Sequence, residues 1–406
     1  MDEDFWAEQY KRAGTPQLHP VLVGFNVNLD RIIPVSRNLL DLPEFQSDEL
    51  SEIRLHLIHS MENCTAEEWL VSDRAQYARF TEYFSSTGSL AMGGQAGIAA
   101  LHLASLGVPD VFCLAPELGP EGLQMLANQG VRVPDEISGA GSGSDTIHLV
   151  FEYKPGLVPL AEGALPRDNR FIASPKKTAE NTLIPQNSLA AILPQITSCT
   201  RAFLSGYQYL QDEGEFARAA DQIQVLKKCN PLMRVHIECV SVTDASVLAG
   251  LVRHILPVAD SCGMNEYELS LLLGSAGRIS PAGLVKGVLE LAKKTGLIRV
   301  HLHTFGYYLL IIHKDRFAPE DSRTALLYAA RVVAKVAGGT TTHLSPAGID
   351  AVKQIVGVFQ KGPVPGSFTA GDYFILAVPT LIAHDIKKTA GLGDILSSTA
   401  FVAERF

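Results

Sequence analysis

The segment Gly391-Leu392-Gly393-Asp394 has the residue types and spacing that most directly indicate chemistry. It follows the apolar run 374–383, and the pattern of residues 392–404 predicts a helix. Glycines before a helix let backbone N–H groups approach an anion, which a helix N-terminus attracts. Asp394 would lie in the first turn, where its carboxylate could accept a proton from a hydroxyl attacking a bound phosphoryl group. The alternative is an ordinary helix-start aspartate with two loop glycines.

Acidic residues at the ends of two neighbouring predicted strands form a second candidate group. Glu238 lies on a strongly apolar strand and shares a face with His236. A carboxylate there is costly to bury unless it is paired or bound to a metal. Asn265 can cap the next helix, with Glu266 and Glu268 in its first turn. Alternatively, the two strand ends could hold Mg²⁺, mostly through its waters.

Three further polar clusters could bind a ligand or could be structural. His301 and His303 share a strand face, as a metal pair or as structural histidines. Asn28 and Asp30 follow a buried strand, and carboxylate and amide groups suit sugar hydroxyls; the alternative is an Asx-rich loop. The segment Gly93-Gly94-Gln95-Ala96-Gly97 could present backbone donors and an amide to a ligand, or could simply allow close helix packing.

The elements that must position these residues alternate between strand and helix. Strands are predicted at 20–25, 111–115, 202–205, 234–240, 261–264, 299–304 and 374–378. Helices are predicted at 5–13, 215–229, 247–255, 266–273, 281–295, 321–335, 347–359 and 392–404. This alternation predicts an α/β fold with a parallel sheet covered on both faces. Polar residues just past such strands lie where open α/β sheets bind ligands.

Two stretches lack this rhythm and predict a second, smaller domain. Residues 31–91 show no strand–helix alternation, whereas 146–153 and 170–173 resemble strands of another sheet, beyond a break at 140–144. We therefore expect a large α/β domain built from 1–30, 92–145 and 187–406, and a small domain built from 31–91 and 146–186.

Composition narrows the functional classes. The 406 residues carry a net charge of −9 and are 47% hydrophobic, so a folded chain without general affinity for nucleic acid or anionic membrane is expected. An acidic start and the lack of a bilayer-length apolar run disfavour a secreted or membrane-spanning protein. Six scattered cysteines without a CxxC pair disfavour a zinc ribbon and suit a reducing cytoplasm.

Taken in order, these segments resemble the ADP-dependent glucokinase and phosphofructokinase family, within the ribokinase-like superfamily. The resemblance covers nearly the whole chain. Its motifs are Asn28/Asp30, Gly93 to Gly97, Phe151-Glu152-Tyr153, Asn169-Arg170-Phe171-Ile172, His236-Ile237-Glu238, Asn265-x-x-Glu268, His303-Thr304 with Tyr307, and Gly391-Leu392-Gly393-Asp394.

The resemblance implies a ribokinase-like three-layer αβα large domain with a smaller inserted α+β lid. It implies a kinase that takes its phosphoryl group from ADP and releases AMP. Its site residues fall into three groups. Asp394 would be the base, with Gly391, Gly393 and Arg170 beside the phosphoryl group; Arg170, His303 and Gly393 would contact the nucleotide; and Glu238, Glu268 and Asp394 would organise Mg²⁺.

The acceptor sugar would be held by a set of polar groups from both domains. These are Asn28, Asp30, Glu68, Gly94, Gln95 and His148. In the family, a glutamate at the place of Glu68 and a histidine at the place of His148 mark enzymes that use glucose. If the alignment is shifted by one residue, Glu67 takes the place of Glu68. Users of fructose 6-phosphate would need basic groups, here Lys154, Lys176 and Lys177, where arginine is the better phosphate ligand.

The primary hypothesis is therefore an Mg²⁺- and ADP-dependent glucokinase. The alternatives are a 6-phosphofructokinase, an enzyme that accepts both sugars, a non-catalytic sugar or nucleotide sensor, and an ATP-using sugar kinase. Small-molecule sugar and ADP are the expected partners of a cytoplasmic monomer, with an oligomer left open. Residues 336–366 are expected to supply some of the adenine contacts.

Overall fold

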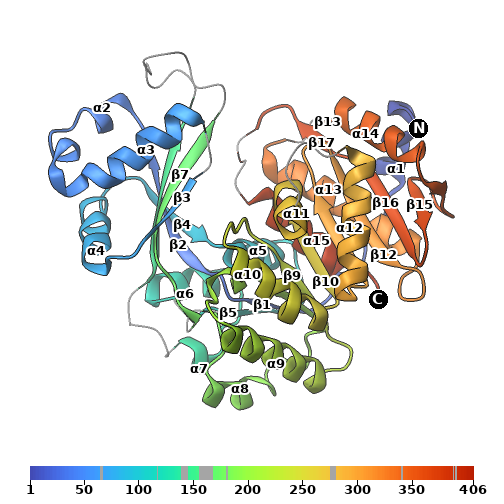
Figure 1. Cartoon of the computed structure of the whole chain (residues 1–406), viewed down its shortest axis with the longest axis horizontal. Coiled ribbons are helices and arrows are strands. Elements are labelled where there is room, and N and C mark those ends of the chain that lie inside the picture. Colours follow the sequence, from blue (N-terminus) through green and yellow to red (C-terminus); the bar gives the residue numbers. More distant parts are fainter. Residues whose placement is uncertain are drawn as a thin grey trace.

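The computed structural model describes residues 1–406 except 65–66, 117, 139–144, 155–167, 180–181, 275–279, 340–341, 387 and 389–390. The break predicted at 140–144 lies outside the described residues. Two sheets organise the described chain, a larger one and a smaller one, and each is packed against helices (Figure 1).

The larger sheet has ten strands in the order β14-β15-β16-β12-β11-β10-β9-β8-β1-β5. In that order the strands are Gln360–Lys361, Ser367–Ala370, Tyr373–Pro379, Tyr307–His313, Arg299–His303, Ser261–Asn265, Arg234–Glu238, Arg201–Leu204, Val21–Gly24 and Val111–Leu114. The six strands from β11 to β5 are parallel, as predicted. The other four are antiparallel and were not predicted as such, because β12 returns from β11 through a turn of only three residues.

Helices cover both faces of the larger sheet, which confirms the three-layer α/β prediction. Helices α5 (Gln95–Ser105), α13 (Pro319–Ala337) and α15 (Leu392–Ala403) form one layer (Figure 1). The other layer contains α9 (Glu213–Cys229), α10 (Ala245–Gly250), α11 (Glu266–Leu273), α12 (Pro281–Thr295) and α14 (Pro346–Val356). The remaining helices of this part are α1 (Glu3–Arg12), α6 (Pro120–Asn128), α7 (Asp135–Ser138) and α8 (Gln186–Ile192).

The smaller sheet has five strands in the order β3-β7-β6-β2-β4. They are Glu67–Val71, Asn169–Pro175, Ile147–Tyr153, Asn28–Pro34 and Ser89–Gly93. Helices α3 (Ser51–Asn63) and α4 (Arg74–Tyr83) pack on one face, with α2 (Arg37–Leu40) nearby, and lie on the side away from the larger sheet (Figure 1).

The prediction that residues 31–91 lack regular alternation is wrong. Among the described residues of this stretch are helices α2, α3 and α4, strand β3 and parts of β2 and β4. Strand β3 reads Glu67-Glu68-Trp69-Leu70-Val71, and only Val71 of it is buried. A strand with little burial and a helix that mixes polar and apolar positions give a weak periodic signal. The division into two domains with the stated boundaries stays a prediction.

A short connection between the two sheets positions the first candidate residues. Strand β1 ends at Gly24, and β2 of the smaller sheet begins at Asn28. Asn28 and Asp30 therefore lie where the chain passes from one sheet to the other. A separate two-stranded sheet, β13 (Thr342–Leu344) with β17 (Leu381–Ala383), lies on the path to α15.

Candidate active site

Helix α15 begins at the glycine-containing segment, as the sequence predicts. Gly391 is its N-cap with a φ of 70°, a backbone conformation that favours glycine. A Cβ on Gly393 would lie 2.9 Å from Cε1 of His303, so this glycine allows the imidazole to pack against the helix start. The first turn thus carries Asp394 beside backbone N–H groups that the helix itself cannot satisfy.

Asp394 lies among other charged groups, and their balance sets its acidity. Burial, together with the negative charges of Glu238 and Glu268, raises the pKa of Asp394 to about 7, although His303 and Arg170 act in the opposite direction. A carboxyl group that titrates near neutrality is well matched to accept a proton from a hydroxyl at physiological pH.

Glu238 is the most completely hydrogen-bonded carboxylate of the site. Its Oε2 accepts from His236 Nε2 at 2.9 Å and from Ser397 Oγ at 2.7 Å. Its Oε1 lies 3.1 Å from His303 Nε2. Burial would raise the pKa of Glu238, but the bonds to His236 and His303 hold it well below its usual range. Glu238 is therefore a buried anion.

His303 is the cationic partner of Glu238. Burial favours its neutral form, yet the bond to Glu238 and the charges of Glu238, Glu268 and Asp394 raise the pKa of His303 to about 9. His301, two residues earlier, is buried, and neither of its ring nitrogens has a hydrogen-bond partner among the described residues. The two histidines face different surroundings, and their rings meet edge to face rather than around a shared centre.

Glu268 is positioned by the start of α11. Asn265 caps this helix through its side chain, and Glu268 Oε2 accepts the Asn265 backbone N–H at 2.8 Å, which completes a capping box. Burial, with the nearby charge of Glu238, raises the pKa of Glu268 to about 7. In the described part of the chain, no group of three or more His, Cys, Asp or Glu side chains is arranged as a metal site.

The candidate sugar-binding residues of the smaller sheet share one face, which we call the polar face. Its residues are Asn28 and Asp30 on β2, His148 on β6, Arg170 and Ser174 on β7, and Glu68 on β3. Strand pairing sets Asp30 opposite His148 and Glu68 opposite Ile172. Alternation then places these side chains on the side opposite the apolar core that packs on α3 and α4.

Strand alternation also separates the two neighbouring glutamates of β3. Glu68 accepts a hydrogen bond from Ser174 Oγ at 2.7 Å on the polar face. Glu67 points to the other face, where it lies 2.9 Å from His56 Nδ1. The structure therefore favours Glu68 over Glu67 as the candidate sugar ligand.

Three predicted sugar-binding residues carry buried polar atoms without a hydrogen-bond partner in the described structure. They are Asn28 Oδ1, Gln95 Oε1 and His148 Nε2. The other half of each amide is fixed: Asn28 Nδ2 donates to Asp30 Oδ1 at 2.7 Å, and Gln95 Nε2 donates to the Cys239 carbonyl at 2.8 Å. Buried polar atoms are normally satisfied, so these are candidate contacts for a polar ligand.

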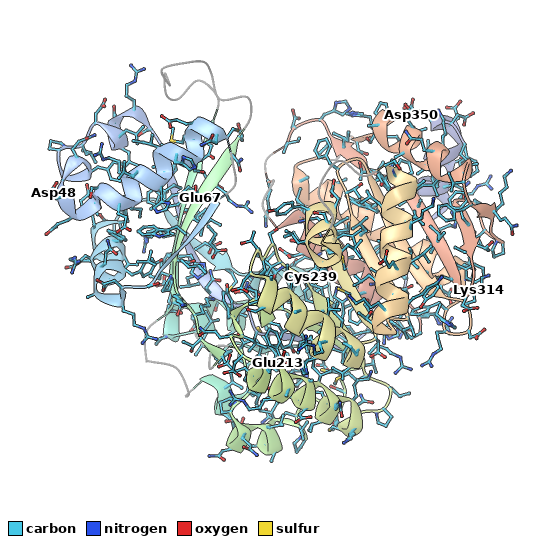
Figure 2. All side chains as sticks on the ribbon, viewed as in Figure 1. Asp48, Glu67, Glu213, Cys239, Lys314 and Asp350 are labelled. Atoms are coloured by element: carbon cyan, nitrogen blue, oxygen red, sulfur yellow. The ribbon has the colours of Figure 1, made fainter. Side chains whose placement is uncertain are left out.

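Gly93 and Gly94 make room for this arrangement. A Cβ on Gly93 would lie 2.1 Å from Asp30 Oδ1, and one on Gly94 would lie 2.3 Å from the Asn26 carbonyl oxygen. Burial raises the pKa of Asp30 to about 6, although its bond from Asn28 lowers it. Figure 2 labels Glu67 on the smaller sheet and Cys239, which directly follows β9 of the larger sheet.

Arg170 connects the two halves of the site electrostatically. Its positive charge lowers the pKa of both Asp30 and Asp394. Lys177 is buried, donates to Asn26 Oδ1 at 3.3 Å and lies over the ring of Tyr209, whereas Lys154 and Lys176 are exposed. Sequence reasoning missed Ser174 and Ser397. Ser397 lies three residues after Asp394 on α15, and that helical spacing could have indicated it.

The comparisons with known proteins agree with this geometry. A model of the ADP-specific phosphofructokinase/glucokinase conserved region matches residues 19–403. An ADP-dependent glucose/glucosamine kinase of Pyrococcus furiosus is 29% identical over 460 aligned positions, which cover 98% of each chain. An ADP-specific phosphofructokinase of Methanosarcina acetivorans is 25% identical over 493 positions, which cover 99% of this chain and 98% of the other.

A solved structure shares the fold. An ADP-dependent kinase in complex with fructose 6-phosphate and ADPβS has a TM-score of 0.81 at 24% identity, covering 99% of this chain and 98% of that one. None of the described helices is long and apolar enough to cross a membrane. Because the family model spans nearly the whole chain, the protein belongs to the ADP-specific phosphofructokinase/glucokinase family and is an ADP-dependent sugar kinase.

Proposed function

We propose that the protein is a glucokinase that converts ADP and D-glucose to AMP and D-glucose 6-phosphate. The observation that carries the proposal is the pairing of two sites. Asp394 lies at the start of α15 among Glu238, Glu268 and His303, and Arg170 acts electrostatically on both Asp394 and Asp30. The polar face around Asp30 carries buried, unsatisfied polar atoms.

In the proposed reaction, Asp394 takes the proton of the C6 hydroxyl as its oxygen attacks the β-phosphorus of ADP. The new O6–P bond forms while the bond from that phosphorus to the bridging oxygen breaks, and AMP leaves with the electron pair. Backbone N–H groups of the first turn of α15 and the Arg170 guanidinium stabilise the charge on the transferring group. Catalysis of this kind is mainly positioning and electrostatics.

A divalent cation fits the carboxylates present. Burial and the negative charges of neighbouring carboxylates raise the pKa of Asp394 and that of Glu268 to about 7, although His303 opposes both shifts. We propose that Glu268 and Asp394 help to hold Mg²⁺, with Glu238 behind them, mostly through water. When bound, Mg²⁺ would neutralise charge on the phosphate oxygens.

Two features of the polar face support glucose over fructose 6-phosphate. Glu68 is available on this face, and a carboxylate suits a free hydroxyl but repels a phosphate. His148 is buried, and its Nε2 has no partner in the described structure, which also suits a hydroxyl. Lys177 is buried beside Asn26 and over Tyr209, so it is held in place within the fold. Exposed Lys176, directly after β7, favours the alternative phosphofructokinase.

The test is a matrix of ADP and ATP against glucose, glucosamine and fructose 6-phosphate, with AMP and sugar phosphate measured directly. We expect the highest kcat/KM for ADP with glucose. A higher kcat/KM for fructose 6-phosphate would replace glucokinase with phosphofructokinase, and similar values would indicate an enzyme for both sugars. Calorimetric binding of sugar without AMP formation would instead indicate a sensor.

The compartment is also a proposal. All six cysteines are free thiols, which supports a reducing compartment such as the cytoplasm.

A further inference from the structure

A layer of buried polar side chains lies between helix α15 and the larger sheet; we call it the α15 layer. Its members are His236 and Glu238 on β9, Ser261 on β10, Arg299 on β11, and Ser397 and Glu404 on and just after α15. All six are at most 3% exposed. A polar layer in such a position is costly unless its groups bond to one another, so its hydrogen-bond connectivity matters.

Three of these residues form a row across adjacent strands. Ser261 is directly opposite His236 on one side and directly opposite Arg299 on the other. Arg299 Nη1 lies 3.0 Å from Ser261 Oγ, Ser261 Oγ lies 2.7 Å from His236 Nδ1, and His236 Nε2 lies 2.9 Å from Glu238 Oε2. The row therefore ends on the carboxylate that pairs with His303.

The chemistry of the partners fixes the direction of each bond. Arginine can only donate, so Ser261 Oγ accepts from Arg299. Among the described residues, His236 Nδ1 is the only acceptor within reach of the Ser261 hydroxyl hydrogen, so a satisfied hydroxyl donates to Nδ1. This leaves the proton of His236 on Nε2, which lies 2.9 Å from Glu238 Oε2 and 3.1 Å from Ser397 Oγ, the hydroxyl that itself donates to Glu238.

The far end of the row is anchored at the end of α15. Arg299 Nε donates to Glu404 Oε2 at 2.5 Å, and both side chains are fully buried. Arg201 Nη2 donates to the backbone carbonyl of Glu404 at 2.6 Å. The same helix carries Asp394 in its first turn and Ser397, which donates to Glu238 Oε2. The middle of α15, through Ser397, and its C-terminal end, through Glu404, are thus bonded to the sheet that carries Glu238.

We propose that Ser261 and Arg299 are positioning residues for catalysis: through the row Arg299–Ser261–His236 they fix His236 as the Nε2–H tautomer and so orient Glu238 beside Asp394. Without the Ser261 hydroxyl, His236 can place its proton on Nδ1. Its Nε2 would then face the Glu238 carboxylate with a lone pair, which is repulsive. Glu238 would lose one of its three side-chain hydrogen bonds and turn from its position.

The tautomer is measured directly by ¹⁵N NMR of the full-length protein labelled at histidine, with the His236 signal assigned from the His236→Gln variant. We expect a protonated Nε2 in the wild type and a shift toward Nδ1–H in Ser261→Ala. Ser322→Ala is the matched control, because Ser322 is a buried serine on α13 whose hydroxyl has no partner in the described structure. A wild-type His236 in the Nδ1–H form overturns the proposal.

The kinetic arm rests on the proposed kinase reaction, whereas the NMR arm does not. Loss of a partner behind an active-site ligand typically costs about 10- to 100-fold in activity. We expect such a fall in kcat for Ser261→Ala, with KM for glucose and ADP unchanged within about twofold, and recovery in Ser261→Thr. A kcat equal to that of Ser322→Ala overturns the proposal, whereas a wild-type protein that forms no AMP overturns the kinase assignment instead.

A second pair of variants covers the case in which the Ser261 variants do not fold. The side-chain amide of His236→Gln can donate to Glu238 from the place of Nε2, whereas that of His236→Asn mimics Nδ1 and cannot. We expect His236→Gln to retain at least about tenfold more kcat than His236→Asn at comparable melting temperature. Equal activities, or a more active Asn variant, would contradict a role for the Nε2 proton.

Discussion

The α15 layer and the polar face of the smaller sheet are both polar regions that contact the proposed reaction centre, but they differ in how far they are satisfied. Around Glu238 in the α15 layer, the carboxylate accepts bonds from three side chains and Ser261 is bonded on both sides. Only at the far end of this layer do Arg299 Nη2 and Glu404 Oε1 lack a partner in the described structure. On and beside the polar face, Asn28, Gln95 and His148 each keep a buried atom without a partner in the described structure.

The difference indicates a division of labour. The groups around Glu238 have their hydrogen bonds without ligand, so they hold the phosphoryl-transfer geometry in place and need not reorganise during the reaction. Groups that are incomplete gain hydrogen bonds only when a sugar with matching hydroxyls arrives, and a poorly matched sugar leaves them unsatisfied. The α15 layer thus supports the chemical step, and the polar face supports sugar selectivity. Substitutions in the α15 layer should mainly lower kcat, whereas substitutions on the polar face should change kcat/KM for particular sugars.

Asp394→Asn should give the largest effect, because it removes the proposed base at the junction of the two regions. We expect kcat to fall by about a thousandfold or more, with little change in KM for glucose. The raised pKa of Asp394 means that its stabilising contribution is present at low pH and is lost as pH rises through about 7. At pH 8 the variant should therefore melt no lower than wild type, and near-wild-type turnover would contradict the role.

Gly263→Ala should specifically disturb the hydrogen-bonded groups around Glu238 in the α15 layer. Its Cβ would lie 2.1 Å from Glu238 Oε2 and 2.6 Å from Ser397 Oγ, so the carboxylate must move. Overpacking of this kind costs about 1 to 3 kcal/mol of unfolding free energy, and kcat should fall with it. Gly14→Ala is the control, since nothing lies within 4 Å of a Cβ there. Denaturant unfolding and kcat measured together would show whether the site tolerates the methyl group.

Glu68→Ala and Glu67→Ala form a matched pair that tests the polar face. The two residues are neighbours on β3, yet only Glu68 lies on the polar face. We expect Glu68→Ala to lower kcat/KM for glucose by about 10- to 100-fold, with a much smaller loss for fructose 6-phosphate. Glu67→Ala should change neither by more than about threefold. Equal losses for the two sugars would argue against Glu68 as the selective group.

The pH dependence of glucose binding should be the mildest effect. Burial raises the pKa of Asp30 to about 6, so its carboxylate becomes protonated below that pH and no longer accepts two hydroxyl hydrogens. KM for glucose should rise toward about tenfold per pH unit below 6, and Asp30→Asn should remove this dependence. A wild-type KM that stays constant from pH 5 to 8 would rule out this role for Asp30.

The sequence predicts local arrangements well because caps and periodicity are local. Helices α11 and α12 have the bounds that were predicted, since Asn265, Ser280-Pro281 and Gly296 mark their ends. The placement of Asp394 in a first turn and of Asn28 beside Asp30 follows from spacing in the same way.

Contacts between distant segments could not be predicted in this way. The bond from Ser261 to His236 depends on the register of two strands that no short pattern specifies. The partnership of Arg299 with Glu404 joins residues 105 positions apart. Strand β3 was missed because most of its side chains are exposed or half-buried, so its sequence does not alternate clearly between apolar and polar residues.

The alternation along β3 has an evolutionary consequence. Because Glu67 and Glu68 point to opposite faces, inserting or deleting a single residue ahead of this strand would exchange them and leave the catalytic helix untouched. A lineage could thus change its preferred acceptor through one small indel. Libraries that vary loop length at this strand are consequently a more promising route to new sugar substrates than substitutions near Asp394.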